Sequence, residues 1–285
     1  MNFPPLPITP GQLTADADRY RAVCSMLRSA ELYRLAFSCI DLTTLNQTDT
    51  VSHVAAFTQR VNSFVREFPG IDSVAAICVF PNMASVVREN LAVEGVQIAA
   101  VAGGFPSSMT FAEVKAEEAR MAVLSGAGEV DIVLPLWAFL EENYDYCRRE
   151  ISLVKQSIGD AHLKVILESG ILADPEKIWK ASLLSLEAGA GFIKTSTGKM
   201  AVSATPEAAI VMCHALKYWH ETTGEKRGFK PAGGISVAGE AMVYVTIVED
   251  ILGREWLDNH LFRIGASRLA NDLLTRITGR DTSYF

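Results

Sequence analysis

The chain has 285 residues, of which 49% are hydrophobic and 21% charged, and a net charge of −7. This composition is ordinary for a globular protein with a sizeable core, and the length suits one α/β barrel of about 250 residues. The negative charge and the absence of a basic stretch argue against a nucleic-acid partner. No apolar run approaches the ~20 residues of a membrane-spanning helix, and the first residues lack a signal-peptide pattern.

The cysteines and histidines show neither a disulfide framework nor a metal site. An odd number of scattered cysteines favours free thiols in a reducing cytoplasm over disulfides or zinc. The histidines form no i, i+4 pair, so we expect no metal ion. The cysteines are Cys24, Cys39, Cys78, Cys147 and Cys213.

The order of the predicted elements indicates the fold class. A proline-rich stretch, residues 1–12, predicts an irregular arm, and apolar spacing predicts one helix from Leu13 to about Ala36. Eight strand-like runs then alternate with helix-length segments, as in a (β/α)₈ or TIM barrel. We therefore expect an arm and helix over 1–34 and a barrel domain over 35–285. The runs cover residues 37–42, 74–79, 97–102, 129–134, 163–168, 191–196, 228–232 and 262–266.

A doubly wound parallel sheet is the competing fold. It would usually carry a G-x-G-x-x-G turn after its first strand. Here Asp41-Leu42-Thr43-Thr44 occupies that place, whereas glycine-containing turns precede the fourth and sixth runs. The sequence therefore favours the barrel, with a helical extension at its N-terminus.

The sixth run carries a lysine, Lys194, in its middle. A helix ending near Gly189 precedes it, and Thr205-Pro206 predicts the N-cap and first residue of the next helix. A lysine in a buried strand is costly, because burial disfavours the ammonium form. The same effect makes the amine nucleophilic near neutral pH, so we interpret Lys194 as a Schiff-base lysine.

Further charges lie at strand positions that share a face. Side chains two or four positions apart in a strand point the same way, so these groups are expected inside the barrel. The sixth and seventh strands are neighbours there, and repulsion between their lysines would lower the pKa of one of them. For Lys164, Glu129 and Glu168, a buried salt-bridge network is an equally open interpretation. The charged residues are Asp41, Glu129, Asp131, Lys164, Glu168, Lys194 and Lys230.

Glycine-rich loops follow the last three strands. In this fold, backbone N–H groups at the ends of strands seven and eight commonly bind phosphate. Tight turns alone are the alternative explanation for the glycines, and a P-loop does not fit because Met200 follows Lys199. The candidate phosphate residues are Thr197, Gly198, Lys199, Gly233, Gly234, Ser236, Ser267 and Arg268.

Several of these motifs match one family. The stretches Phe192-Ile193-Lys194-Thr195-Ser196-Thr197-Gly198-Lys199 and Gly228-Phe229-Lys230-Pro231-Ala232-Gly233-Gly234 resemble deoxyribose-phosphate aldolases. So do the stretches at 41–45, 75–81 and 129–133, and the resemblance covers roughly residues 35–285 in the right order.

The resemblance implies a class I aldolase without a metal or other cofactor. Such an enzyme reversibly splits 2-deoxy-D-ribose 5-phosphate into glyceraldehyde 3-phosphate and acetaldehyde. It implies that Lys194 forms the Schiff base, Lys230 perturbs it, Asp131 is the acid/base carboxylate, and the tail residue Tyr284 reaches the site. Matching pocket positions are Asp41, Thr43, Cys78 and Lys164. The expected partners are phosphosugar and aldehyde substrates and a second copy in a homodimer, with neither nucleic acid nor membrane.

The chain departs from the family pattern in its phosphate loops. The family commonly has a basic residue where this chain has Ser236, and a serine where it has Arg268. We therefore expect Arg268 to supply the charge that Ser236 does not. Two other functions remain open from the residues alone: another lysine aldolase of the transaldolase or ketose-phosphate kind, and a non-catalytic phosphosugar-binding protein.

Overall fold

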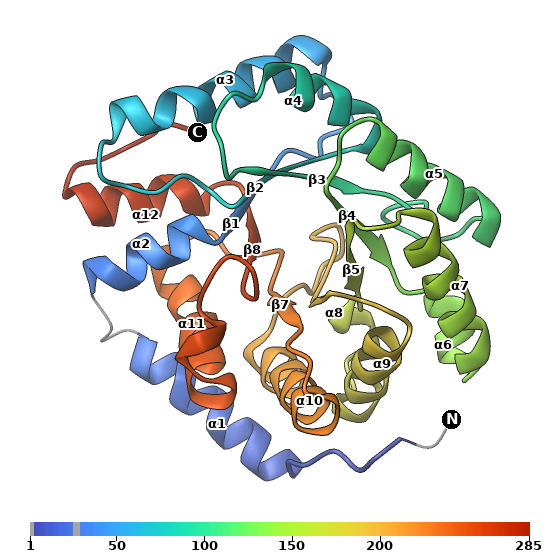
Figure 1. Ribbon diagram of the computed structural model, residues 1–285. Helices are drawn as coiled ribbons and strands as arrows, with labels where there is room; N and C mark the ends of the chain where they lie inside the picture. The colour runs from blue at the N-terminus through green and yellow to red at the C-terminus, as the bar shows by residue number, and fades with distance from the viewer. Residues whose placement is uncertain (1–2, 25–28) are drawn as a thin grey trace.

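The computed structural model describes residues 3–24 and 29–285, which fold into a closed parallel barrel surrounded by helices (Figure 1). Its eight strands are hydrogen-bonded in the order β7-β6-β5-β4-β3-β2-β1-β8. Two parallel bridges, Phe229 with Phe262 and Ala232 with Gly265, join the remaining edges. The prediction of a TIM barrel is confirmed.

The strands are three to five residues long, shorter than most of the predicted runs. They are β1 (Ile40–Thr43), β2 (Ala76–Val79), β3 (Gln97–Val101), β4 (Glu129–Val133), β5 (His162–Ile166), β6 (Phe192–Lys194), β7 (Gly228–Lys230) and β8 (Ile264–Ala266). The connecting helices are α3 (Val51–Glu67), η1 (Pro81–Met83), α4 (Ala84–Asn90), α5 (Ala112–Leu124), α6 (Leu136–Leu140), α7 (Tyr144–Ser157), α8 (Ser169–Leu172), α9 (Pro175–Glu187), α10 (Pro206–Thr223), α11 (Ala238–Leu252), η2 (Arg254–Trp256) and α12 (Leu269–Thr278).

The N-terminal extension differs from its prediction. Instead of one helix from Leu13 to Ala36, the chain forms α1 (Pro10–Cys24) and α2 (Ala30–Ser38). Ser29 has extended dihedral angles (φ −98°, ψ 126°) and so interrupts the helix, while residues 25–28 lie outside the described part. The break lets α1 pack on α10 and α11, and α2 on α12. The predicted domain boundary at 34/35 falls inside α2 and stays a prediction.

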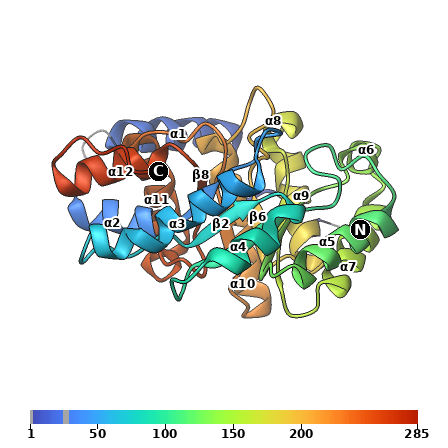
Figure 2. The same cartoon turned by 90° about the horizontal axis from the view of Figure 1, so that it is seen from above.

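The arm before α1 is irregular, as expected, and it lies along the outer helices. The Pro4 carbonyl accepts a hydrogen bond of 2.8 Å from Nε1 of Trp179 on α9. The Phe3 ring meets the Tyr144 ring of α7 edge to face, with 5.2 Å between centroids. Figure 2 shows α1, α2 and α12 on the side of the molecule opposite α5, α6 and α7.

The hydrophobic core of the described residues has one large part and two small clusters. The large part lies between the strands and the inner faces of the helices. One of the small clusters, which includes two alanines and Cys78, belongs mainly to β2 and β3. Because these side chains are short, they leave room inside the barrel for the long charged side chains of the other strands. The cluster consists of Leu45, Ala76, Cys78, Ala99 and Val101.

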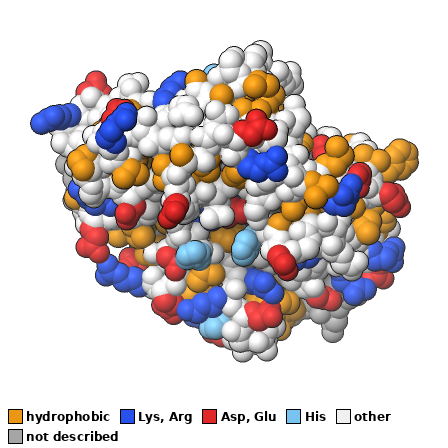
Figure 3. All heavy atoms as spheres, turned by 45° about the horizontal axis from the view of Figure 1, so that its top comes forward, with side chains coloured by type: hydrophobic (Ala, Val, Ile, Leu, Met, Phe, Trp, Pro, Cys, Tyr) orange, Lys and Arg blue, Asp and Glu red, His pale blue; other side chains and the backbone are white. Residues whose placement is uncertain are grey.

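The described helices do not have the features of a membrane span, and Figure 3 shows how charges are distributed on one face of the molecule. None of the described helices combines the length and apolar character needed to cross a bilayer. On the face drawn in Figure 3, side chains of both charge signs are interspersed. The described cysteines Cys39, Cys78, Cys147 and Cys213 are buried free thiols, whereas the side chain of Cys24 lies outside the described residues.

Candidate active site

Strand β6 places Lys194 at the carboxyl end of the barrel. The helices on either side of this strand begin and end where the sequence predicted. Helix α9 ends before Gly189 (φ 104°), and Oγ1 of Thr205 accepts a hydrogen bond of 3.2 Å from the Ala208 N–H, which caps α10. Lys194 is only 4% exposed, yet it lines a cavity of about 270 Å³. It is therefore a buried amine that a small ligand can reach.

The barrel register sets Lys194 directly beside Lys230 on β7. Between them lies the carboxylate of Asp131 from β4, whose Oδ2 accepts 2.8 Å hydrogen bonds from both ammonium nitrogens. Its other oxygen accepts from Lys164 at 3.1 Å. One fully buried carboxylate thus contacts three lysines.

The two neighbouring lysines differ in their electrostatic surroundings. Burial lowers the pKa of Lys194, and the charge of Lys230 lowers it further, so that the attraction of Asp131 does not restore it. Burial also acts against the Lys230 ammonium, but Asp131 and Asp41 outweigh it and raise its pKa. Asp131 is buried too, yet the lysines hold the pKa of its carboxyl well below its usual range. The surroundings therefore disfavour the ammonium form of Lys194 and favour that of Lys230.

A second layer of ion pairs lies deeper in the barrel. Lys164 donates to Glu129, and Lys230 donates to Asp41. The guanidinium of Arg263 joins both carboxylates, at 2.6 Å to Asp41 and 2.7 Å to Glu129. The sequence reasoning missed Arg263, although its place in the eighth run was a signal for an inward charge.

Glu168 does not take part in these ion pairs. Its carboxylate accepts hydrogen bonds from the backbone N–H (3.3 Å) and Oγ1 (2.6 Å) of Thr197. The residue adopts a left-handed backbone (φ 52°), which directs its side chain towards the loop after β6. The salt-bridge interpretation therefore holds for Lys164 with Glu129, whereas Glu168 shapes the loop that follows Lys194.

The predicted site residues other than Tyr284 lie at two depths in the barrel. Those that line the cavity are Thr43, Lys194, Thr197, Gly198, Lys199, Gly233, Gly234, Ser236, Ser267 and Arg268. Those buried beneath it, in the barrel interior, are Asp41, Cys78, Asp131, Lys164 and Lys230. The other lining residues were not predicted individually as site residues, although each lies close in sequence to a predicted strand end; they are Leu45, Asn46, Ala232, Ile235, Gly265 and Ala266.

Two glycines allow the loops after β6 and β7 to meet. Gly233 has a φ of 82°, and a Cβ there would come within 2.6 Å of the Ser203 side chain and 2.9 Å of the Gly198 Cα. Any larger residue would therefore push the two loops apart. This close approach explains the glycines better than a turn requirement alone.

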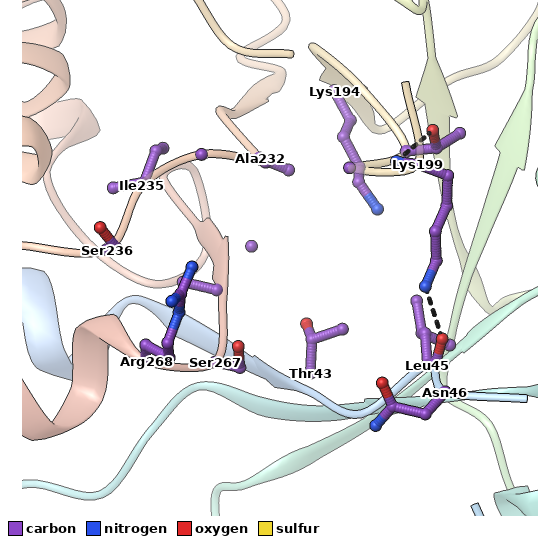
Figure 4. Close-up of a pocket in the computed structure, with 16 residues that line it drawn as sticks. Thr43, Leu45, Asn46, Lys194, Lys199, Ala232, Ile235, Ser236, Ser267 and Arg268 are labelled. Atoms are coloured by element: carbon purple, nitrogen blue, oxygen red, sulfur yellow. Dashed lines mark hydrogen bonds between the residues drawn. The ribbon is translucent and has the colours of Figure 1, made fainter. Parts of the chain in front are cut away.

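The polar side chains of the cavity differ in whether they already have a partner within the protein. Nζ of Lys199 donates to the Leu45 carbonyl at 2.6 Å and so links the loops after β6 and β1 at one side of the cavity (Figure 4). The backbone N–H and the hydroxyl of Ser236 both donate to the carboxylate of Glu240, at 2.7 and 3.3 Å. Arg268 is exposed, and its side chain has no hydrogen-bond or ion-pair partner in the described part of the chain. Of these cations, Arg268 is the one without a protein partner.

Tyr284 is not at the cavity, in contrast to its expected place. Its hydroxyl donates to the Arg60 carbonyl of α3 at 2.8 Å, and its ring meets Phe68 edge to face. The backbone N–H groups of Tyr284 and Phe285 both donate to Asn271. The tail is held on α3 and α12 because its two aromatic rings bury apolar surface there, and it would have to leave α3 to reach Lys194.

The fold and this lysine cluster define a TIM-barrel enzyme. No group of three or more potential metal ligands of the His, Cys, Asp and Glu types occurs within the described ranges. A family model described as "DeoC/LacD family aldolase" matches residues 35–252, and the chain belongs to this family. It is thus an aldolase, a lyase acting on carbon–carbon bonds.

Individual relatives agree with this family. A Caenorhabditis elegans protein is 45% identical over 258 residues, covering 90% of this chain and 85% of its own length. The deoxyribose-phosphate aldolase of Homo sapiens is 39% identical over 87% of this chain and 83% of its own. A solved structure from Toxoplasma gondii has the same fold, with a TM-score of 0.77 at 23% identity, over 88% of this chain and 96% of that one.

Proposed function

We propose that the protein reversibly cleaves 2-deoxy-D-ribose 5-phosphate into glyceraldehyde 3-phosphate and acetaldehyde through an imine on Lys194. The observation that carries the proposal is the environment of Lys194. Lys194 is buried, its pKa is lowered, and it lines the cavity, while the carboxylates of Asp131 and Asp41 raise the pKa of its neighbour Lys230. The names of the similar aldolases supply the sugar.

The proposed reaction follows from these protonation states. The Lys194 amine attacks the aldehyde carbon C1, and loss of water gives a protonated imine, which is an electron sink. A water held by Asp131 removes the proton of the C3 hydroxyl, the C2–C3 bond breaks, and glyceraldehyde 3-phosphate leaves. The enamine on Lys194 is protonated at C2, with the Lys230 ammonium beside it as a proton source. Hydrolysis then releases acetaldehyde and restores the amine.

The proposed mechanism calls for no metal or organic cofactor, because the imine itself accepts the electrons. The phosphate would lie against the glycine-rich loops at the ends of β7 and β8, where Gly233, Gly234 and Ser267 line the cavity. Arg268 would supply its charge partner. The cytoplasmic location and the homodimer stay predictions.

Borohydride trapping tests the assignment. The protein is reduced in the presence of deoxyribose 5-phosphate or acetaldehyde, digested, and the modified lysine is located by mass spectrometry. We expect a single adduct on Lys194, none on Lys199, and no adduct after Lys194→Leu. Lys199→Leu is the matched control and should still be trapped.

The same experiment separates the alternatives. An adduct on Lys230 would reverse the roles of the two lysines. Trapping with ketone donors but not acetaldehyde would indicate a ketose-phosphate aldolase. A folded protein that binds the sugar phosphate and traps nothing would be a binding protein, and the proposed activity would be wrong.

A further inference from the structure

The buried charges of the barrel form one connected network. Asp131 links Lys164, Lys194 and Lys230 at the carboxyl end, and Arg263 links Asp41 and Glu129 at the amino end. Contacts of Lys164 with Glu129 and of Lys230 with Asp41 join the two layers. We call this the barrel ion network; its members are Asp41, Glu129, Asp131, Lys164, Lys194, Lys230 and Arg263.

The network has one more basic side chain than it has carboxylates. The network holds three carboxylates, and Lys164, Lys230 and Arg263 supply three positive charges. It is therefore neutral when the fourth cationic group, Lys194, carries no proton. Since an uncompensated charge in a buried site costs several kcal/mol, the balance favours the free amine of Lys194.

Arg263 contributes to this balance without touching the active-site cavity. It lies just before β8, at the amino end of the barrel, where with Glu129 it lines a separate cavity of about 210 Å³. It is 4% exposed, and its Nε donates to the Asn259 carbonyl. Its hydrogen bonds and ion pairs are all with protein oxygen atoms, and its guanidinium also lies 5.9 Å from the centroid of the Phe192 ring, so it is not a free ligand-binding cation.

We propose that Arg263 is a positioning residue of the catalytic lysine: by neutralising Asp41 and Glu129 from the far end of the barrel, it leaves Lys194 uncharged and nucleophilic. Without Arg263, the Lys164 and Lys230 ammonium groups would be drawn towards Glu129 and Asp41. Asp131 would then be left for Lys194, and Lys194 would hold its proton to compensate it.

The other charged and titratable groups around Lys194 do not replace this effect. The carboxyl of Glu168 is bound to Thr197 and forms no ion pair with a lysine. Lys199 donates to the Leu45 carbonyl, and Arg268 is exposed. The groups that face Lys194 from the neighbouring elements are Asp41 (β1), Cys78 (β2), Asp131 (β4), Lys164 (β5), Glu168 (after β5), Lys199 (after β6), Lys230 (β7) and Arg268 (before α12).

Competitive labelling measures the protonation of Lys194 without relying on catalysis. The folded protein is exposed to a trace of acetic anhydride over a range of pH, and acetylation of Lys194 is quantified by mass spectrometry. For Arg263→Gln we expect the labelling midpoint, and the acid limb of kcat/KM, to move to higher pH by about one unit or more. Arg263→Lys keeps the charge and should stay near the unchanged protein.

Two further variants test the proposal: one should shift the labelling midpoint of Lys194 in the opposite direction, and the other should reverse the shift caused by Arg263→Gln. Glu129→Gln removes a carboxylate and should move the midpoint to lower pH. Glu129→Gln with Arg263→Gln removes one charge of each sign and should return the midpoint towards its original value. If Arg263→Gln does not fold, the downward shift of Glu129→Gln remains decisive, with circular dichroism as the folding control.

This inference rests on the proposed function, but the two can fail separately. Lowered thermal stability in the Arg263 and Glu129 variants with an unmoved Lys194 midpoint would mean a purely structural salt bridge and would overturn the proposal. Absence of a borohydride adduct on Lys194 in the unchanged protein would instead overturn the proposed imine, whatever the labelling midpoints are.

Discussion

Lys194, Lys199 and Lys230 are the same residue type within one site, yet each has different surroundings. Lys230 contacts two carboxylates and keeps its proton, because attraction outweighs burial. Lys194 contacts one carboxylate and faces Lys230, so the effect of burial outweighs the attraction of that carboxylate and the pKa of Lys194 is lowered. Nζ of Lys199 donates a hydrogen bond to the backbone carbonyl of Leu45. At the scale of single residues, the properties of each lysine therefore depend on the groups that its Nζ atom contacts.

Asp131→Asn tests whether this carboxylate moves protons or only balances charge. The amide cannot accept a proton, so retro-aldol turnover should fall by about two orders of magnitude or more, the usual scale for a general base. Borohydride trapping on Lys194 should persist, because losing a carboxylate further favours the free amine. Steady-state kinetics and the trapping assay are run on the same preparation. Near-normal turnover would leave Asp131 as a charge partner alone.

Arg268→Ser tests the charge partner of the phosphate. Charge-assisted hydrogen bonds are worth about 1.5–3 kcal/mol, and 1.4 kcal/mol corresponds to tenfold, so KM for deoxyribose 5-phosphate should rise about tenfold or more. Unphosphorylated deoxyribose should react as before. Arg276→Ser is the control for the change in net charge, because Arg276 lies on α12, the helix that Arg268 precedes, and is paired with Asp272.

An equal loss on both substrates in Arg268→Ser would argue against a phosphate contact. Ser236→Arg added to Arg268→Ser should restore part of the affinity. The restoration is expected to be incomplete, because Glu240 lies beside position 236 and would pair with the new guanidinium.

At the scale of elements, the short C-terminal segment after α12 acts as a clamp on α3. The rings of Tyr284 and Phe285 lie 5.9 and 5.8 Å from that of Phe64, between centroids, and both residues bond to Asn271 of α12. The segment thus ties the last helix of the barrel to the helix that follows β1.

Deleting residues 281–285 should therefore lower the free energy of unfolding. Two half-buried aromatic side chains are lost and Phe64 gains exposure, which together amount to about 2–4 kcal/mol. Urea titration followed by circular dichroism measures the change. Deletion of the arm residues 1–2 provides a control truncation of the opposite end, and an unchanged urea midpoint in the C-terminal truncation would show that the clamp contributes nothing.

At the scale of the whole molecule, the barrel ion network makes stability depend on acid. The pKa values of Asp41, Glu129 and Asp131 lie below their ordinary values of 3.8, 4.5 and 3.8, because the buried cations outweigh burial. These carboxylates therefore stabilise the fold fully above those ordinary values. The contribution is lost as pH falls below them, because the unfolded chain then binds protons that the folded chain does not.

We expect the free energy of unfolding to decrease steeply with decreasing pH below about pH 4.5, the ordinary pKa of a glutamate. Urea titrations at a series of pH values measure the slope. Glu129→Gln should reduce the slope, whereas Glu117→Gln, which removes an exposed carboxylate paired with Arg120 on α5, should leave it nearly unchanged. Equal slopes in the two variants would contradict the role of the network.

Much of this architecture was readable in the sequence because its signals are local. Eight alternating runs, a capped α10 at Thr205-Pro206 and a glycine at the end of α9 depend on residues near one another in the chain. The neighbouring positions of Lys194 and Lys230 followed from the barrel topology, and their register pairing bears this out. The single N-terminal helix was wrong, because the break at Ser29 serves packing on two different helices rather than a local signal.

What the sequence determined by itself was the barrel, the strand that holds Lys194 and the loops that line the cavity, because periodicity, caps and glycines act over a few residues. Which charges pair was decided by the tertiary structure alone. Asp41 and Arg263 are 222 positions apart and Lys194 and Asp131 are 63 apart, yet they meet inside the barrel. The protonation of a buried lysine depends on the sum of all such charges, and only the closed barrel brings them within reach of one another.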